Sequence, residues 1–163
     1  MSTRSQVKVI GTIGEGSQML YHHTDGYPDY MIPLLKSAAK LALDNSSAVK
    51  CDHKDAIKFS VSALPWEAGR VGKAASALCA SDPLVMEPDA NQLHGDIAYF
   101  YRLYLVDPSG SGHCGERVQW DIEVLTPNTG FWDNPTEENM TVTLARKPLH
   151  KVTKRDIKIA SQR

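Results

Sequence analysis

Cysteine is scarce in this chain, and its few thiols are far apart. The three cysteines are Cys51, Cys79 and Cys114, an odd number without a CxxC spacing. This pattern gives no basis for a disulfide framework or a zinc knuckle. Long apolar runs are also missing, since no stretch approaches the roughly 18 to 20 residues that a membrane-spanning helix needs. The first five residues are polar with no apolar segment behind them, so we expect no secretory signal and a cytoplasmic location.

Signatures of several common catalytic sites are absent as well. The sequence contains no GxSxG elbow, no phosphate-binding P-loop and no HExxH motif. His113 and Cys114 are adjacent in sequence, which is not the spatial pairing that a Cys-His catalyst uses. These features favour a non-catalytic protein without a catalytic residue, a cofactor or a bound metal. One catalytic alternative stays open, a metal-dependent hydrolase whose ligands would be His22, Asp25, His94 and Asp96.

Charge is distributed unevenly along the chain. The 163 residues include 18 Lys/Arg and 19 Asp/Glu. Seven of these basic residues but only one acid, Asp156, lie between Arg146 and Arg163. We therefore expect a single domain over residues 1–145, followed by a basic tail over residues 146–163. Such a tail can contact an acidic partner or its own acidic body, and its lack of interleaved aromatics argues against nucleic acid as the partner.

Apolar and polar residues alternate at the start of the chain. Residues 6–13 and 17–22 follow this pattern and predict a β-hairpin. A helix is expected next, opening at Asp29 or Tyr30. Pro33 would then lie in the first turn, where the missing N–H of proline does no harm.

The later elements are predicted from the same kinds of pattern. Pro65 and the Ala-rich run behind it predict a second helix that reaches Ala80, and the two prolines of residues 81–92 predict a loop. Residues 48–63 fit either a strand or a helix. Three more strands are expected, over residues 97–106, 117–124 and 141–145. The order of elements favours an α+β fold, an antiparallel sheet of about five strands with two helices packed on one face.

The densest cluster of side-chain chemistry is Tyr21-His22-His23-Thr24-Asp25-Gly26-Tyr27-Pro28-Asp29-Tyr30. Read as a turn, the cluster needs only Asp25, Gly26 and Pro28, whose side chains suit a tight connection into a helix. Read as a ligand site, it offers Tyr21 and Tyr27 as aromatic walls, and the following helix N-terminus would attract an anion such as phosphate. His22 and its neighbour point to opposite faces of a strand, so only one of them can serve such a site. Both interpretations stay open.

A second group of candidates lies about seventy residues later in the sequence. His94-Gly95-Asp96 precedes a strand in which Tyr99 and Tyr101 share one face. Tyrosine rings together with an arginine and a histidine suit the base and the phosphates of a nucleotide. The expected ligand-binding residues are Arg4, Tyr21, His22, Asp25, Tyr27, Tyr99 and Tyr101.

Three segments of the chain resemble a group of small proteins encoded by bacteriophages and other mobile elements. They are the start Met1-Ser2-Thr3-Arg4, the YHHTDGYPDYMIPLL of residues 21–35 and the LHGDIAYFY of residues 93–101. Members of that group share a Ser-Thr-Arg strand, a tyrosine followed shortly by an acidic residue and GYP, and a GDI-x-Y-x-Y strand. The resemblance implies a phage-type accessory protein that acts in the host-cell cytoplasm and counters host defence. It implies no mechanism.

Two functions of different classes follow from these features. The first is a non-catalytic binding protein that sequesters a small anionic, nucleotide-like ligand, and we expect it to be a homo-oligomer because pockets often form between subunits. The second is an inhibitor of a host defence protein that uses the basic tail and the Phe131-Trp132 loop. Two bulky aromatics in a Gly/Pro loop are typical of a partner contact.

Overall fold

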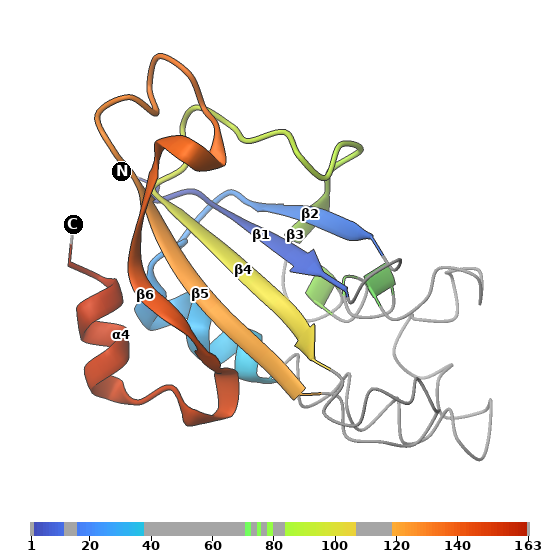
Figure 1. Ribbon diagram of the computed structural model, residues 1–163, viewed down its shortest axis with the longest axis vertical. Helices are drawn as coiled ribbons and strands as arrows, with labels where there is room; N and C mark the ends of the chain where they lie inside the picture. Colours follow the sequence, from blue (N-terminus) through green and yellow to red (C-terminus); the bar gives the residue numbers. More distant parts are fainter. Residues whose placement is uncertain are drawn as a thin grey trace.

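A six-stranded mixed sheet organises the fold, with the strand order β3-β2-β1-β4-β5-β6 (Figure 1). In this computed structural model, the described residues are 2–11, 16–37, 71–72, 75, 78–79, 84–106 and 119–162. The strands are β1 (Ser5–Ile10), β2 (Ser17–His22), β3 (Leu84–Met86), β4 (Tyr99–Val106), β5 (Gln119–Pro127) and β6 (Met140–Pro148). The chain is also helical at residues 28–37, at residues 71–72, 75 and 78–79, in the 3-10 turns η4 (Glu137–Asn139) and η5 (Leu149–Lys151), and in α4 (Lys154–Ala160). No helix within these described parts of the chain is long and apolar enough to cross a membrane.

The expected α+β class is confirmed, with one correction to the sheet. β1 and β2 form the predicted antiparallel hairpin, but β1 pairs with β4 in parallel. A parallel pair needs a long crossover connection, and the segment between β2 and β4 supplies it. Alternation within a strand reveals which side chains share a face but carries no information on strand direction. The prediction of a purely antiparallel sheet is therefore wrong.

Each of the five predicted strands has a counterpart in the sheet, and one observed strand was not predicted. β3 lies inside the segment that was expected to be a loop. That prediction gave the two prolines of the segment more weight than its three apolar residues. It forms as an edge strand through antiparallel pairing with β2. The first helix begins at Pro28, because the Tyr27 carbonyl accepts the first bond, from the Met31 N–H at 2.8 Å. Pro33 consequently lies in the second turn, not the first.

Several predictions concern residues outside the described parts of the chain. They are the ambiguous segment 48–63, residues 12–13 of the first predicted strand and residues 117–118 of a later one. The second predicted helix is helical wherever its residues are described.

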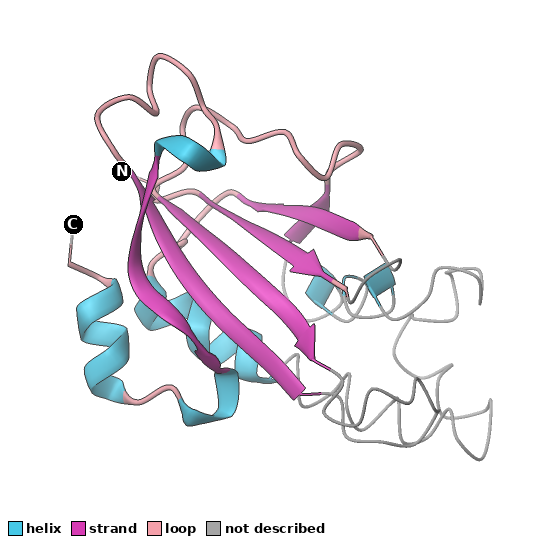
Figure 2. Ribbon diagram, in the orientation of Figure 1, coloured by secondary structure: helices cyan, strands magenta, loops and turns pink. Residues whose placement is uncertain are grey.

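The two faces of the sheet are covered by different parts of the chain, one by helices and the other by loop segments. On the helix face, Val7 of β1 lies between Leu20 of β2 and Tyr101 of β4. The helix at residues 28–37, the helical residues 71, 75 and 78, and the segment from η5 to α4 bury side chains in the core on this face. The helix at residues 28–37 lies behind the sheet in Figure 2. On the loop face, Gln6 lies between Tyr21 and Phe100. A smaller apolar cluster covers that face, supplied in part by the segment 87–98 between β3 and β4 and by the segment 128–139 between β5 and β6.

The basic segment at the C-terminus belongs to this fold. Arg146 and Lys147 lie in β6, and the chain then passes through η5 into α4. Leu149, Val152 and Ala160 are buried in the helix-face core. Residues 146–162, expected as a tail, are therefore packed against the body.

Candidate functional site

The three segments that carry the sequence motifs meet at one end of the sheet. The Gly26 N–H donates to the Thr3 carbonyl at 2.8 Å, and the Ala98 N–H donates to the Arg4 carbonyl at 2.8 Å. Backbone bonds therefore join the entry to β1 with the exit from β2 and with the entry to β4. We call this region, residues 2–5, 21–27 and 94–101, the motif corner.

Gly26 is required by close packing at the centre of the motif corner. A Cβ atom at this position would lie 2.8 Å from Ser5 Cβ and 2.9 Å from the Arg4 carbonyl carbon. The buried Tyr101 hydroxyl donates to the Gly26 carbonyl at 2.7 Å. The preceding Asp25 is exposed and has a positive φ of 54°, a conformation that Asp tolerates better than most residues. The turn interpretation of this motif accounts for all of these contacts.

The sheet divides the predicted ligand-binding residues between its two faces. His22, Tyr99 and Tyr101 lie on the helix face, while Tyr21 lies on the loop face, because β1 places Ser5 between His22 and Tyr99 and places Gln6 beside Tyr21. Arg4 joins the loop-face group through Asp96. The seven residues thus lie near one another without facing one common space.

The helix-face group is buried beneath two exposed tyrosines. His22, Tyr99 and Tyr101 are at most 2% exposed, whereas Tyr27 and Tyr30 are 41% and 44% exposed. The Tyr27 ring packs 6.3 Å from Tyr99, and the Tyr30 ring stacks 5.9 Å from His22. Burial raises the pKa of Tyr101 well above its ordinary value, with smaller contributions from Tyr99 and Asp29. Tyr101 is therefore a neutral structural donor, and only the two exposed rings of this group are open to a ligand.

The loop-face group is centred on Tyr21. Its ring stacks on His94 at 4.4 Å and meets the edge of His23 at 4.6 Å. Its hydroxyl donates to the Asp96 carboxylate at a distance of 3.4 Å, and Asp96 also forms an ion pair with Arg4. Burial raises the pKa of Tyr21, and the Asp96 carboxylate raises it further. The phenol therefore stays protonated at neutral pH and acts as a donor.

Two residues that hold this group were not predicted from the sequence. The Glu87 carboxylate lies 3.1 Å from His94 Nε2. Gln6 is fully buried, donates to the Gln92 carbonyl at 3.1 Å and accepts from the His94 N–H at 2.9 Å. Gln6 fixes the segment before β4 on the sheet, although a polar residue in an alternating strand is typical of a solvent-facing position.

The candidate metal ligands are not brought together. His22 lies on the helix face, while His94 and Asp96 lie beside Tyr21 on the loop face. Across the described segments, no group of three or more His, Cys, Asp or Glu side chains is placed to hold a metal ion.

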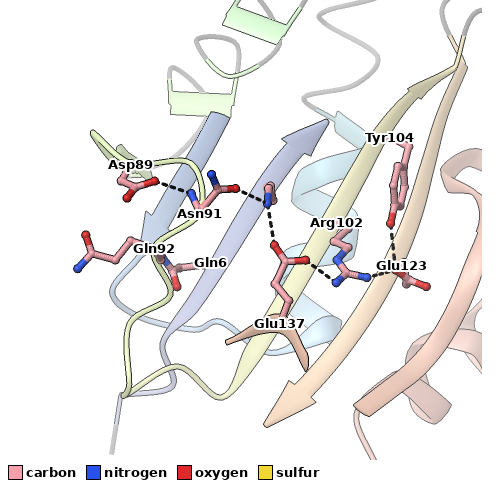
Figure 3. A network of polar contacts seen from close by, with 9 residues as sticks. Gln6, Asp89, Asn91, Gln92, Arg102, Tyr104, Glu123 and Glu137 are labelled. Atoms are coloured by element: carbon pink, nitrogen blue, oxygen red, sulfur yellow. Dashed lines mark hydrogen bonds and ion pairs between the residues drawn. The ribbon is translucent and has the colours of Figure 1, made fainter. Parts of the chain in front are cut away.

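A network of charged residues lies on the loop face beyond the motif corner (Figure 3). Arg102 donates to Glu123 at 2.9 Å and to Glu137 at 2.5 Å, and Lys8 donates to Glu137 at 2.7 Å. The Tyr104 hydroxyl donates to Glu123 at 3.1 Å. Burial alone would raise the pKa of Glu137, but the hydrogen bonds from Lys8 and Arg102 outweigh it and lower that pKa. The network attaches η4, and with it the 128–139 loop, to the sheet.

The two aromatics of that loop have different environments. Phe131 is fully buried in the loop-face cluster, while Trp132 is 60% exposed and meets Phe131 edge-on at 5.7 Å. Asn128 accepts from the Gly130 N–H at 2.9 Å, and Asn139 donates to the Asn134 carbonyl at 2.9 Å. The loop therefore holds an exposed tryptophan on an anchored backbone.

Comparison with known proteins adds no relative: no family model, no curated protein and no solved structure matches this chain.

Proposed function

We propose that this protein is a non-catalytic binding protein whose motif corner takes a small anionic, nucleotide-like ligand. The observation that carries the proposal is the convergence of the three motif segments, up to about ninety residues apart in the sequence, at one end of the sheet. The resemblance to mobile-element proteins supports a role in countering host defence, in which the ligand would be sequestered.

Tyr27 of the motif corner and Tyr30, which lies just beyond it in the first helix, are the surfaces on which a base would stack. Both rings are partly exposed, and each is held from beneath by a buried aromatic partner, Tyr99 or His22. A ring held in place loses little conformational freedom when a ligand stacks on it. Tyrosine also combines a large apolar surface with a polar edge, which suits the rim of a wet site.

Arg4, on the loop-face side of the motif corner, is the cation that would receive the anionic group of a ligand that reaches across the corner from Tyr27. Its backbone lies against Gly26, the residue before Tyr27. Its partner Asp96 is 46% exposed, and Arg4 itself is 43% exposed. Exposed ion pairs contribute only about 0–1 kcal/mol, so a phosphate can replace the Asp96 carboxylate at small cost. A guanidinium binds phosphate through two parallel hydrogen bonds, which favours the exchange.

Thermal shift with a panel of nucleotides tests this proposal. A ligand at about 100 times its Kd stabilises the folded state by about 2.7 kcal/mol, so Tm should rise by about 5–10 °C for a chain of this size. Arg4→Gln should remove the shift, and Asp96→Asn should enlarge it, because that change frees the guanidinium. Arg146→Gln is the matched control, since Arg146 is a comparably exposed ion-paired arginine that lies over Tyr104 near the other end of β4. A shift that Arg4→Gln leaves unchanged would contradict the proposal.

A second candidate function, inhibition of a host defence protein, is favoured by Trp132. A large aromatic on an anchored loop is typical of the residues that dominate protein interfaces. Trp132→Ala should abolish retention of a host protein in a pull-down, while Val142→Ala, which removes another exposed apolar side chain, should not. Equal retention of the host protein by both variants would exclude the 128–139 loop as the binding surface. The expected homo-oligomer stays a prediction, which sedimentation velocity can test.

A further inference from the structure

We propose that the surface formed by η5 and α4 binds the phosphate backbone of nucleic acid without sequence preference. Four exposed cations define this surface, which we call the basic face: Lys151, Lys154, Arg155 and Lys158. The inference is independent of the ligand proposed for the motif corner.

The cations of the basic face differ from the other described cations in having no partner. Every described Lys or Arg outside the basic face makes a hydrogen bond or an ion pair: Arg4, Lys8, Lys36, Arg102, Arg146 and Lys147. Within the described parts of the chain, the four cations of the basic face make neither. No acid among the described residues neutralises their charge, which is therefore available to an anion.

The body of the protein holds the basic face in a fixed place. Thr153 and Asp156 form a capping box at the start of α4, and Lys147 donates to Asp156 at 2.8 Å. Asp156, the one acid in this segment, is thus bonded to Thr153 at the helix N-terminus and to Lys147 of β6. Ala160 is buried in the core. Because the helix is anchored on its inner side, its exposed cations are left without an acidic partner among the described residues, and Asp156 is already engaged by Lys147 and Thr153.

The chemistry of this surface suits phosphate better than an acidic protein. Protein interfaces usually have an apolar centre, and α4 exposes only one large apolar side chain, Ile159. Surfaces that bind nucleic acid are polar and strongly positive, and their Lys and Arg side chains contact phosphate oxygens. Lys154 and Lys158 are one helical turn apart, about 6 Å, while a duplex presents one negative charge per roughly 1.7 Å of its axis. Each cation can therefore meet a phosphate.

This inference departs from the expectation drawn from the sequence, which argued against nucleic acid as the partner of this segment. The lack of aromatic residues near the C-terminus argues against stacking on bases, and no aromatic lies between Leu149 and Gln162. Contacts to the backbone need no aromatic residue. The expected binding is therefore weak, sequence-independent and strongly dependent on salt.

Fluorescence anisotropy with a labelled duplex of random sequence, repeated over a range of salt concentrations, tests the inference. Non-specific binding of this kind has a Kd of about 10⁻⁴ to 10⁻⁶ M, and four phosphate contacts give a slope of log K against log salt of about −3.6. Substituting Lys154, Arg155 and Lys158 together by glutamine should reduce the slope to about −0.9. The double variant Lys154→Arg with Lys158→Arg, which preserves both charges, should keep the wild-type slope.

Two further binding measurements distinguish nucleic acid from an acidic protein as the partner. Ile159→Ala should leave duplex binding unchanged, because no apolar contact is involved. Poly-glutamate at the same charge concentration should bind more weakly than the duplex. Preference for poly-glutamate, an unchanged slope in the triple variant, or no duplex binding at 50 mM salt would each overturn the inference. The triple variant should retain the nucleotide shift at the motif corner, so failure of one proposal can be told from failure of the other.

Discussion

Replacing Gly26 with alanine should destabilise the protein at the motif corner. The added Cβ would lie 2.8 Å from Ser5 Cβ and 2.9 Å from the Arg4 carbonyl carbon. The second of these is a backbone atom of the chain entering β1, which cannot rotate away. Relief of the overlap requires the turn to move from β1, and this movement lengthens the bonds from the Gly26 N–H to Thr3 and from Tyr101 to the Gly26 carbonyl.

The expected loss in the free energy of unfolding is centred on about 2–3 kcal/mol, within a range of about 1–3.6 kcal/mol. Overpacking a close contact costs about 1–3 kcal/mol, and weakening one hydrogen bond adds about 1 kcal/mol. Against this, alanine restricts the unfolded chain and returns about 0.4–1 kcal/mol. For a chain of this size, the net loss corresponds to a fall in Tm of about 5–10 °C.

Urea unfolding followed by tryptophan fluorescence, with thermal unfolding by circular dichroism, measures this effect. Gly95→Ala is the matched control, because a Cβ at Gly95 would meet nothing within 4 Å. We expect that variant to stay within about 0.5 kcal/mol of the wild type. If the Gly26 and Gly95 variants unfold at the same urea concentration, the argument from close packing is refuted.

Three further predictions concern other parts of the fold. Phe131→Ala should lower the free energy of unfolding by about 3–5 kcal/mol, as for other buried aromatics, while Trp132→Ala should change it by less than about 0.5 kcal/mol; urea titration compares the two. Glu137 has a folded-state pKa below its ordinary value of 4.5, so its ionised form stabilises the protein above that pH and the contribution disappears as pH falls through the folded pKa. The stability gap between wild type and Glu137→Gln should therefore narrow below pH 4.5 in pH-dependent urea titrations. Thr153→Ala should cost about 1 kcal/mol through loss of the N-cap of α4, again measured by urea titration.

Local periodicity was sufficient to predict most of the strands and the fold class. β2 has the predicted bounds, and β4 and β6 overlap their predicted segments. In β4, buried side chains alternate with partly exposed ones after Tyr99 and Phe100, and this difference between the two faces is the physical origin of the pattern. The turn role of Gly26 was also predictable, since glycine between Asp25 and an X-Pro pair is typical of a tight connection.

Features that depend on distant partners could not be read from the sequence. β3 exists because the edge of β2 is available to it, and the parallel pairing of β1 with β4 depends on a crossover whose path no local pattern encodes. The seven predicted ligand-binding residues were grouped by sequence proximity and by face. The position of β1 between β2 and β4 separates them, because Ser5 and Gln6 point to opposite faces of the sheet.

The contacts within the motif corner separate residues that the fold requires from residues that it leaves free for function. Gly26, Tyr101 and Gln6 are buried and bonded, so their identity is explained by packing alone. Arg4 and Tyr27 are partly exposed, and the fold would lose little if either were replaced. A motif that served only the turn would need Gly26 and Tyr101 but not Arg4 and Tyr27. The motif segments contain residues of both kinds, and this is therefore the strongest reason to look for a ligand at the exposed rim of the corner rather than in its packed interior.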